Sequence, residues 1–377
     1  DDFELIAQQI IQNDIDLVVV GPEKPLVDGL RDFLLKRFPS LMIIGPGAKG
    51  AQLEGSKDFA KRFMAKYSIP TAAFQTFDSS TVKEAYAFLD KLYSPFVLKA
   101  DGLAGGKGVI IEENIDAAKE CIAEMFSGKF GKASEKVVIE QFLSGIEVSV
   151  FVLTDGDSYV ILPEAKDYKR IGVGDTGLNT GGMGAVSPVP FADAEFMGKV
   201  EERIVKPTVE GLKKEGIDYK GFIFLGLMNC GGDPYVIEYN VRMGDPETEA
   251  VMTRIDSDFL SHLKAAATGR LADEKVEFSP QAAVTVIIAS GGYPEKYKSF
   301  YPIYGLDSVK NVTVFHSGTK SSSEGVITSG GRVLAVTANA STVEKAKEQA
   351  FNAVEEIDFK DCYYRSDIAD DIINYGK

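Results

Sequence analysis

Three polar side chains alternate along residues 234–249, which read PYVIEYNVRMGDPETE. β-Branched and aromatic residues after a Gly-Gly-Asp-Pro turn predict a strand over residues 235–242. Because side chains alternate between the faces of a strand, Glu238, Asn240 and Arg242 share one face. Glu238 and Asn240 present oxygen atoms about 6 to 7 Å apart along the strand, so both can reach one Mg²⁺ ion. Arg242 suits bidentate binding of a carboxylate or phosphate. The alternative is an ordinary solvated face of a sheet.

The residues after this strand predict the start of a helix. Asp245 is placed to cap it, Pro246 suits the first turn, and Glu247 suits the positive end of the helix dipole. Both acidic residues therefore have a structural explanation, although Glu247 is also a candidate for substrate binding.

A glycine-rich turn joins two predicted strands in the segment PFVLKADGLAGGKGVII. The strand 96–100 delivers Lys99, and the turn Gly105-Gly106-Lys107-Gly108 leads into the strand 109–111. Glycines let the backbone approach a ligand and direct N–H groups toward it, and the lysines add positive charge, which favours a polyphosphate. The turn is not a Walker motif, because no Gly-Lys-Ser/Thr begins a helix. The alternative is a tight hairpin turn without a ligand.

Two further segments carry candidate ligands. In VIEQFLSGIEVSV, the backbone from Glu140 to Leu143 could bond an adenine edge and Glu147 could accept from ribose hydroxyls, although solvated glutamates are the simpler explanation. The run EAKDYKRIGVGDTGLNTGGMGAVSP combines charged residues with glycines, and Gly181-Gly182-Met183-Gly184 predicts a nest of backbone donors. The alternative for this run is a disordered loop.

Composition excludes several classes of function. The chain has 377 residues and a formal net charge of −15, which argues against a nucleic-acid partner. Two histidines make a Ser-His-Asp triad or a histidine-rich metal site a poor interpretation, so oxygen ligands and therefore Mg²⁺ or Mn²⁺ are favoured. Three dispersed cysteines without Cys-x-x-Cys spacing predict a reducing, cytoplasmic location. We find no membrane span and no signal peptide in the sequence.

The pattern of elements predicts several α/β and α+β domains. Residues 1–47 alternate helix and continuous apolar strand, which indicates a parallel sheet covered on both faces. Strands and two helices over 72–153 predict a small α+β lid, and residues 155–190 show few strand signals. A helix over 192–216, strands over 221–229 and 235–242, helices over 246–254 and 257–267, and an α/β unit from about 279 complete the prediction.

Together these motifs resemble the ATP-grasp superfamily in order and separation: Gly55-Ser56-Lys57, the Lys99 strand with its turn, Glu140 and Glu147, and Glu238-x-Asn240-x-Arg242. Three runs resemble the phosphoribosylamine–glycine ligase (glycinamide ribonucleotide synthetase) family: VLKADGLAGGKGV, AKDYKRIGVGDTGLNTGGMGAVSP and EYNVRMGDPETE. The segment GPEKPL at 21–26 is similar to that family's N-terminal unit. The resemblance covers essentially the whole chain.

The resemblance implies an ATP-grasp fold and an ATP-dependent ligation. Its domains would be a truncated N-terminal parallel unit (1–53), an ATP-grasp core (54–74 and 151–278), a lid (75–150) and a C-terminal α/β domain (279–377). The substrates would be ATP, glycine and 5-phosphoribosylamine, joined through glycyl phosphate, in a monomer or weak homodimer without nucleic-acid or membrane partners.

The resemblance also implies the residues of the site. Glu238 and Asn240 would bind Mg²⁺ or Mn²⁺, and Arg242 and Lys99 would act in catalysis. The expected ATP contacts are Lys57, Lys61, Lys99, Gly105, Gly106, Lys107, Gly108, Glu140, Gln141, Phe142, Leu143, Glu147, Arg170 and Asn179. The expected substrate contacts are Asp167, Lys169, Gly181, Gly182, Met183, Gly184, Arg242 and Glu247.

Three features depart from the family pattern. The family's opening strand, Gly-rich turn and helix, which contact the phosphoribosyl group, are absent, so we expect a truncated N-terminus. Met243 stands where the family commonly has Phe, which preserves apolar bulk. Many ATP-grasp enzymes carry another Glu on the strand before the metal-binding strand, where this chain reads Gly226-Leu227-Met228-Asn229.

Two alternatives remain at the level of sequence. A biotin-carboxylase-like or aminoimidazole-ribonucleotide-carboxylating ligase would share the fold and would use bicarbonate. A nucleotide-binding module without catalysis would bind ATP without turning it over.

Overall fold

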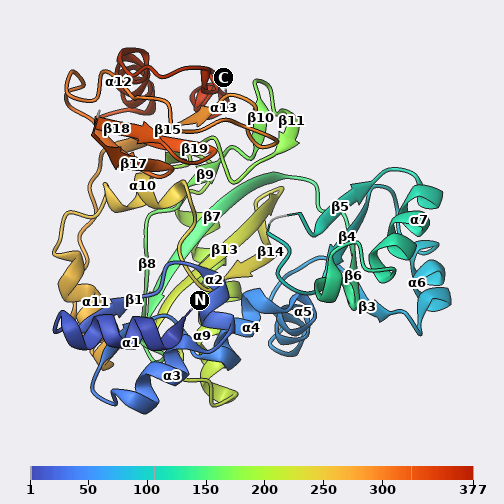
Figure 1. Cartoon of the computed structure of the whole chain (residues 1–377). Coiled ribbons are helices and arrows are strands. Elements are labelled where there is room, and N and C mark those ends of the chain that lie inside the picture. Colours follow the sequence, from blue (N-terminus) through green and yellow to red (C-terminus); the bar gives the residue numbers. More distant parts are fainter. Residues whose placement is uncertain (1, 106, 324, 377) are drawn as a thin grey trace.

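The computed structural model describes residues 2–105, 107–323 and 325–376. Gly106 of the glycine-rich turn therefore lies outside the described residues. A central antiparallel sheet lies between a N-terminal unit and a C-terminal sheet, and a small subdomain projects to one side (Figure 1).

The N-terminal unit is parallel α/β, as its apolar runs predict. β1 and β2 pair in parallel with Val18 opposite Ile43. The Ser56 hydroxyl accepts from the Phe59 N–H at 3.1 Å and so caps the helix that begins at Lys57. The elements are α1 (Phe3–Gln12), β1 (Leu17–Val19), α2 (Glu23–Val27), α3 (Leu30–Arg37), β2 (Met42–Ile44), α4 (Ala48–Gly55) and α5 (Lys57–Lys66).

The projecting subdomain is a four-stranded sheet covered by two helices, and it is the predicted lid. Its strand order is β3-β6-β4-β5, and it has an apolar core of its own that includes Leu98, Ile122 and Ile139. A separate core lets such a unit keep its shape if it moves relative to the rest. Its elements are β3 (Phe74–Asp78), α6 (Val82–Leu89), β4 (Phe96–Ala100), β5 (Val109–Glu112), α7 (Ile115–Phe126), a 3₁₀ turn (Gly131–Ser134) and β6 (Lys136–Gln141).

The central sheet has the order β14-β13-β7-β8, and the lid projects from the side of the sheet on which β14 lies (Figure 1). The predicted strand 235–242 is shorter than expected: it ends at Asn240, so Arg242 lies beyond it. A bulge in β14 opposite Gly226 and Leu227 interrupts the pairing just before Glu238. The strands are β7 (Ile146–Thr154), β8 (Tyr159–Ile161), β13 (Gly221–Cys230) and β14 (Asp233–Asn240).

The predicted helix over 192–216 is present as two α-helices joined by a π-helical turn. These are α8 (Ala194–Val200), the turn (Glu201–Val205) and α9 (Lys206–Lys214). α9 packs under the central sheet, where the Thr208 and Tyr239 hydroxyls lie 2.8 Å apart. Tyr239 therefore points away from the face that carries Glu238 and Asn240.

The expectation of few strands over 155–190 is wrong. The fully buried β12 (Gly184–Ser187) pairs with β9 (Lys166–Asp167) and with β15 (Ala282–Ser290), so this middle segment completes the C-terminal sheet. The pairing is long-range, which local sequence patterns do not report. A hairpin also forms between β10 (Arg170–Gly172) and β11 (Thr176–Asn179).

The rest of the C-terminal region is a mixed α/β unit in which α12 packs on the sheet. The sheet order is β16-β19-β15-β12-β9, and β20 also pairs with β15. The remaining elements are α10 (Glu247–Met252), α11 (Phe259–Thr268), a 3₁₀ turn (Leu271–Asp273), β16 (Thr313–His316), β17 (Thr319–Ser322), β18 (Gly325–Thr328), β19 (Arg332–Ala340), α12 (Val343–Glu356), β20 (Cys362–Tyr363) and α13 (Asp370–Ile373).

The predicted capping role of Asp245 is also wrong. α10 begins at Glu247, Pro246 occupies the capping position, and no side chain caps the helix. The Asp245 carboxylate instead pairs with Arg332 of β19 at 2.9 Å. A counter-charge from a distant strand therefore replaces the local helix contact.

None of the helices in the described part of the chain is long and apolar enough to cross a bilayer.

We expect Leu98→Ala to destabilise the lid, because the Leu98 side chain is 0% exposed in the lid's own core. The expected loss in free energy of unfolding is about 2–5 kcal/mol, measured by urea unfolding with hydrogen exchange of residues 75–141. Ile111→Ala is the matched control: Ile111 is 52% exposed on the neighbouring strand and should change stability by less than about 0.5 kcal/mol. Equal effects of the two substitutions would contradict a separate lid core.

Candidate active site

A buried carboxylate joins the lid to the core of the molecule. Glu140 at the end of β6 forms ion pairs with Lys61 of α5 at 2.7 Å and with Lys99 of β4 at 3.0 Å. The Lys99 ammonium also donates to the Ile237 carbonyl of β14 at 3.0 Å. Lys99 thus reaches from the lid to β14 and binds it at Ile237, the residue directly before Glu238.

Lys61 is not at the surface of the site, which corrects the expectation that it contacts the nucleotide. It is 2% exposed and donates to both Glu140 and the Thr71 hydroxyl, each at 2.7 Å. Burial lowers the pKa of Lys61 to about 8, although Glu140 opposes the shift. Lys61 therefore balances the charge of Glu140 from the core helix α5.

Glu140 likewise has a different role from the one its position in the sequence predicts. Its side chain is 3% exposed, and its backbone lies in the ladder between β3 and β4. The half-buried Phe142 and Leu143 follow the end of β6, after Gln141, whose N–H donates to the Ala73 carbonyl. The predicted adenine contact at this junction of lid and core stays a prediction.

Lys57 enters the site at the start of α5. Its backbone N–H donates to the Asp101 carbonyl at 3.1 Å, and the Asp101 carboxylate accepts from Ser56 and from the Asp58 N–H, each at 2.8 Å. Burial lowers the pKa of Lys57, while the nearby Glu238 raises it. The start of α5 is thus fixed to the beginning of the glycine-rich turn, with Lys57 near enough to Glu238 for their charges to interact.

The glycine-rich turn itself is open. Gly105 has φ +57°, a conformation that glycine adopts without strain, and a Cβ there would meet nothing within 4 Å. Lys107 is exposed, and the Lys107 N–H donates to the Ala104 carbonyl at 3.1 Å. The described part of the turn has room for a ligand, which keeps the phosphate interpretation of Gly105, Lys107 and Gly108 as a prediction.

Glu238 and Asn240 fit a cation that takes most of its ligands from elsewhere. Within the described residues, no hydrogen bond or ion pair engages the Glu238 carboxylate, and the Asn240 amide donates only to the Tyr239 carbonyl at 3.0 Å. The described residues hold no group of three or more His, Cys, Asp or Glu suited to a metal. Mg²⁺ favours such a site, in which the protein supplies two oxygen ligands and phosphates and water supply the other ligands.

Arg242 is held by a residue that the sequence did not reveal. Its guanidinium pairs with Glu54 of α4 at 2.8 Å and lies 3.5 Å from the Glu23 carboxylate of α2. The second Glu54 oxygen accepts from the Val241 N–H at 2.8 Å. Burial raises the pKa of Glu54 to about 7, although Arg242 opposes the shift. Glu54 therefore fixes the chain just after β14, the strand that carries Glu238 and Asn240.

A second charge cluster joins Glu147, which the resemblance implies as an ATP contact, to Asp167 and Lys169, which it implies as substrate contacts. The Lys169 ammonium pairs with Glu147 at 2.5 Å and with Asp167 at 3.1 Å. Partial loss of water around the ammonium opposes its charge, but Asp167 and Glu147 hold the pKa of Lys169 well above its ordinary value. Lys169 in turn lowers the pKa of Glu147. The cluster lies close enough to Glu238 for the two charges to interact.

Glu247 is 4% exposed and lies near enough to Asp167 and Lys169 of this cluster for their charges to interact. It accepts from the Ser149 hydroxyl at 2.9 Å. Burial, reinforced by Asp167, raises the pKa of Glu247 to about 7. Glu247 is therefore placed under the charged residues, and direct contact with substrate stays a prediction.

The predicted nest of donors at Gly181–Gly184 is not open. The N–H groups of Gly181, Gly182 and Met183 already donate to the Tyr293 hydroxyl, the Thr180 hydroxyl and the Tyr168 carbonyl, at 2.8 to 3.0 Å. The glycines instead permit close packing: a Cβ at Gly182, where φ is +116°, would lie 2.4 Å from Pro246. The structure therefore explains these residues by packing against the C-terminal sheet.

Arg170 and Asn179 face each other at the base of the β10–β11 hairpin. Both are exposed, and the Arg170 guanidinium donates to the Gly177 carbonyl at 2.7 Å. They lie on the chain segment that directly follows Lys169, and their expected contact with the nucleotide stays a prediction.

The lid over an antiparallel sheet, with lysines and a carboxylate where they meet, defines a ligase of the ATP-grasp class. Structures of low sequence identity share this fold. One is the biotin carboxylase domain of the Hydrogenobacter thermophilus 2-oxoglutarate carboxylase, solved with MgADP. It matches with a TM-score of 0.74 and 17% identity over 100% of this chain and 86% of that one.

The chain belongs to the phosphoribosylglycinamide synthetase family. Models of that family's N domain, ATP-grasp (A) domain and C domain match residues 1–54, 55–248 and 283–371. A phosphoribosylamine–glycine ligase of Caldanaerobacter subterraneus subsp. tengcongensis is 43% identical over 98% of this chain and 88% of its own length. The crystal structure of the Thermotoga maritima phosphoribosylamine–glycine ligase matches with a TM-score of 0.83 and 38% identity, over 94% of this chain and 86% of that one.

The raised pKa of Glu54 makes a prediction about stability and pH. A carboxyl that binds its proton more tightly in the folded than in the unfolded state stabilises the fold below pH 4.5 and loses that contribution as the pH rises toward about 7. Between pH 5 and 8, the wild type should therefore lose about 3 kcal/mol of unfolding free energy relative to Glu54→Gln.

Urea unfolding at both pH values measures this difference. Glu348→Gln is the control, because Glu348 is exposed on α12 and should follow the wild type. A Glu54→Gln variant whose stability changes with pH in parallel with the wild type would contradict the shift.

Proposed function

We propose that the chain catalyses the ATP-dependent ligation of glycine to 5-phosphoribosylamine through glycyl phosphate. The products are glycinamide ribonucleotide, ADP and phosphate. The observation that carries the proposal is the reach of Lys99 from the lid to the Ile237 carbonyl, beside Glu238. This contact brings a positive charge from the lid next to the Glu238 carboxylate of the central sheet, which no bond engages among the described residues. An enzyme that holds a charged polyphosphate between the lid and the sheet requires such an arrangement.

The nucleotide lies between the lid and the central sheet in this proposal. Lys57, Lys99 and the turn that contains Gly105 and Lys107 bind its phosphates, because they are the cationic groups and open backbone at that junction. Phe142 and Leu143 border the adenine, and Glu147 binds the ribose. Arg170 and Asn179 add contacts from the hairpin.

Glu238 and Asn240 hold a divalent cation, Mg²⁺ or Mn²⁺. When bound, such a cation supplies charge neutralisation of the phosphates. Lys57 and Lys169 balance the Glu238 charge in the free enzyme, since both lie near enough to interact with it. Among the described residues no direct bond engages this carboxylate, so it is available to the cation.

The chemistry proceeds in two displacements. A carboxylate oxygen of glycine forms a bond to the γ-phosphorus of ATP, the bond to the β-γ bridging oxygen breaks, and ADP leaves. The amine of 5-phosphoribosylamine then attacks the carbonyl carbon of glycyl phosphate, the bond to the phosphoryl oxygen breaks, and phosphate leaves as the nitrogen loses a proton. Neither step needs a nucleophile from the protein, which suits a site without histidine or cysteine.

The protein contributes position and charge to these steps. Arg242, fixed by Glu54, stabilises the acyl phosphate at the end of β14. Asp167 and Lys169 border the acceptor side, with Glu247 beneath them. The lid keeps water from the acyl phosphate while it is closed.

Release of ADP in a coupled assay tests the function. We expect it to depend on both glycine and 5-phosphoribosylamine. Release that depends on bicarbonate would favour a carboxylating ligase, and tight ATP binding without any release would favour a binding module.

We expect Glu238→Ala to abolish turnover, with a loss of at least about 100-fold, because it removes the free carboxylate at the cation site. The melting temperature should change little, since the described residues show no bond to this side chain. Asp233→Asn is the control: Asp233 lies on the same strand but pairs with Lys199 and Arg203 at its far end. A fully active Glu238→Ala variant would overturn the assignment of the cation site.

Lys99→Ala should weaken ATP binding by roughly tenfold or more, because it removes an ammonium from the junction of the lid and the central sheet. Calorimetry with ATP measures the affinity directly, independent of turnover. Lys119→Ala, which removes a lid lysine paired with Asp90 on the outer side, serves as the control. Unchanged affinity in Lys99→Ala would mean that the glycine-rich segment is only a hairpin turn.

A further inference from the structure

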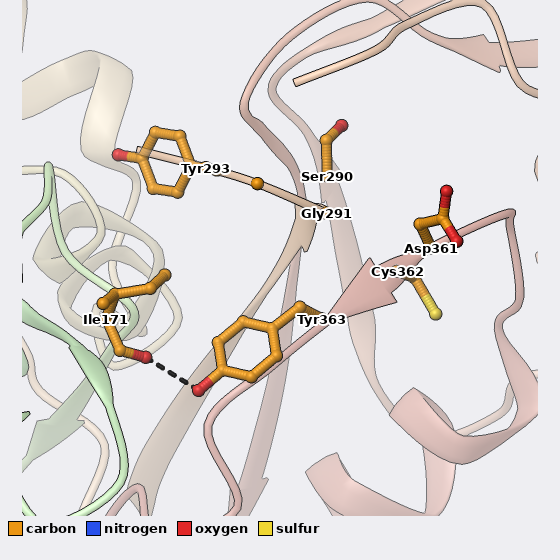
Figure 2. Close-up of a pocket in the computed structure, with 8 residues that line it drawn as sticks. Ile171, Ser290, Gly291, Tyr293, Asp361, Cys362 and Tyr363 are labelled. Atoms are coloured by element: carbon orange, nitrogen blue, oxygen red, sulfur yellow. Dashed lines mark hydrogen bonds between the residues drawn. The ribbon is translucent and has the colours of Figure 1, made fainter. Parts of the chain in front are cut away.

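The β10–β11 hairpin has little apolar attachment to the rest of the molecule. Residues 173–179 are all exposed, and only Ile171 among its apolar side chains packs against the main core. A pocket of about 380 Å³ lies between Ile171 and the C-terminal residues Ser290, Tyr293 and Tyr363 (Figure 2). Something other than apolar packing must therefore hold the hairpin in place.

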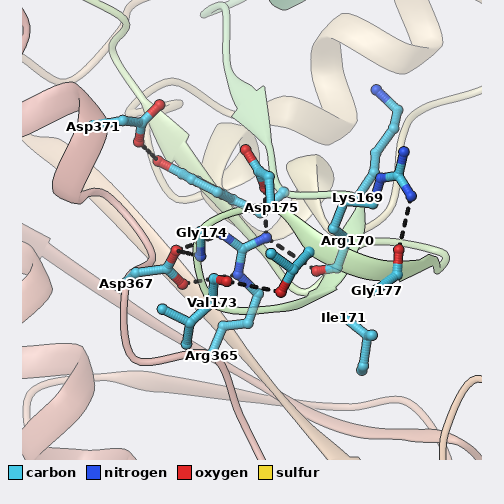
Figure 3. A network of polar contacts seen from close by, with 12 residues as sticks. Lys169, Arg170, Ile171, Val173, Gly174, Asp175, Gly177, Arg365, Asp367 and Asp371 are labelled. Carbon is cyan, nitrogen blue, oxygen red and sulfur yellow. Dashed lines mark hydrogen bonds and ion pairs between the residues drawn. The ribbon is translucent and has the colours of Figure 1, made fainter.

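A buried arginine from the C-terminal segment supplies that attachment. Arg365 is 1% exposed, and its guanidinium donates to the Arg170 carbonyl at 3.0 Å and to the Asp175 carboxylate at 2.7 Å. It also binds both oxygens of Asp367, at 2.7 and 2.8 Å. The Asp367 Oδ2 oxygen, which lies 2.7 Å from the guanidinium, also accepts from the Gly174 N–H at 2.8 Å. The turn that connects the two strands is therefore bound as well (Figure 3).

Two more contacts extend the same attachment. The Tyr363 hydroxyl donates to the Ile171 carbonyl at 2.8 Å, as Figure 2 shows. The Arg365 guanidinium also lies over the Tyr168 ring, 5.3 Å from its centre, and the Tyr168 hydroxyl donates to Asp371 at 2.5 Å. Tyr168 stands between Asp167 and Lys169, so the C-terminal segment also holds the strand of the acceptor-side cluster.

The geometry of these bonds requires arginine. The planar guanidinium makes four hydrogen bonds to acceptors on three residues. A lysine ammonium has only three N–H groups and cannot bind both Asp367 oxygens as a fork while it also reaches the other two acceptors. Burial opposes the charge of Arg365, but Asp367 and Asp175 raise its pKa further above the ordinary value. The charge is therefore permanent, and so is the link.

We propose that Arg365 is a positioning residue for the nucleotide: it fixes the β10–β11 hairpin so that Arg170 and Asn179 face the ATP site. The proposal rests on the proposed function, because it takes the two hairpin residues as ATP contacts. Arg365 itself touches no substrate. Its replacement changes the affinity for ATP because the hairpin is no longer ordered before ATP binds, and the entropy of ordering it is then lost from binding.

The test compares Arg365→Gln, Arg365→Lys and the wild type. Arg365→Gln should raise the KM for ATP roughly tenfold and leave kcat at saturating ATP within about twofold. Arg365→Lys should lie between the two, because it keeps the charge but loses the fork of donors. Hydrogen exchange of residues 170–179 should be faster in both variants, while β13 should exchange as in the wild type.

Lys347→Ala is the matched control. Lys347 pairs with Asp370 and donates to the Ser366 carbonyl, so it supports the same C-terminal segment without contacting the hairpin. It should leave the KM for ATP unchanged. An equal rise in Lys347→Ala, or faster exchange of the hairpin in Arg365→Gln without a change in ATP affinity, would overturn the proposal.

Tyr363→Phe decides the question if Arg365→Gln does not fold. It removes only the bond to the Ile171 carbonyl and should raise the KM for ATP about threefold. Unchanged ATP affinity in this variant would then overturn the proposal. Two measurements on the same proteins separate the two proposals. A wild type that binds ATP in calorimetry but shows no glycine-dependent ADP release in the coupled assay contradicts the proposed function. The ATP affinities of the variants, measured by calorimetry with ATP alone, still decide the role of Arg365.

Discussion

The Glu140 carboxylate, buried between two lysines, is the interaction on which the site depends. Lys61 comes from the core helix α5 and Lys99 from the lid strand β4, so one acidic side chain joins the two bodies. Burying these charges is costly, and removing one member of such a group typically costs about 3–5 kcal/mol. The group carries a net positive charge, and Lys99 delivers it to the Ile237 carbonyl beside Glu238. The orientation of the lid and the charge of the phosphate site are thus set by the same contacts.

Counter-charges from different parts of the chain hold the remaining site residues. Glu54 of α4 holds Arg242, and Glu147 and Asp167 hold Lys169. Glu238 differs, because it interacts with Lys57 and Lys169 without a direct bond among the described residues. Charges that are fixed before the substrate arrives stabilise developing charge without reorganisation. Glu238, which has no direct bond among the described residues, is the carboxylate of the site that remains available to a cation.

The elements with local signals could be predicted from the sequence. The strand that carries Glu238 and Asn240 and the pair of strands around the glycine-rich turn agree with expectation, because neighbours in the chain determine them. The bulge in β14 and its end before Arg242 do not follow from the alternation of residues. The pairing of Glu54 with Arg242 joins residues 188 positions apart, so no spacing rule could find it.

Long-range contacts also explain the predictions that failed. Asp245 has the residue type of a helix cap, but Arg332 of β19 supplies a stronger partner. The glycines at 181–184 have the composition of a donor nest, but neighbouring hydroxyl and carbonyl oxygens take their N–H groups. Local chemistry predicts what a residue can do. The fold decides which partner it meets, and burial decides whether it remains available.

The C-terminal domain is therefore part of the frame of the site. β12, which carries Gly184, lies beside β15 in the C-terminal sheet, and β9, which carries Asp167, lies beside β12. Arg332 binds the Gly181 carbonyl and Asp245, and so joins the loop before β12 to the loop after β14. Asp167 lies on a strand of this sheet and Lys99 on a strand of the lid, so the proposed acceptor and phosphate contacts come from bodies with separate cores. Lys99 and the cluster around Lys169 both lie near Glu238, so the proposed cation site is where the two bodies meet.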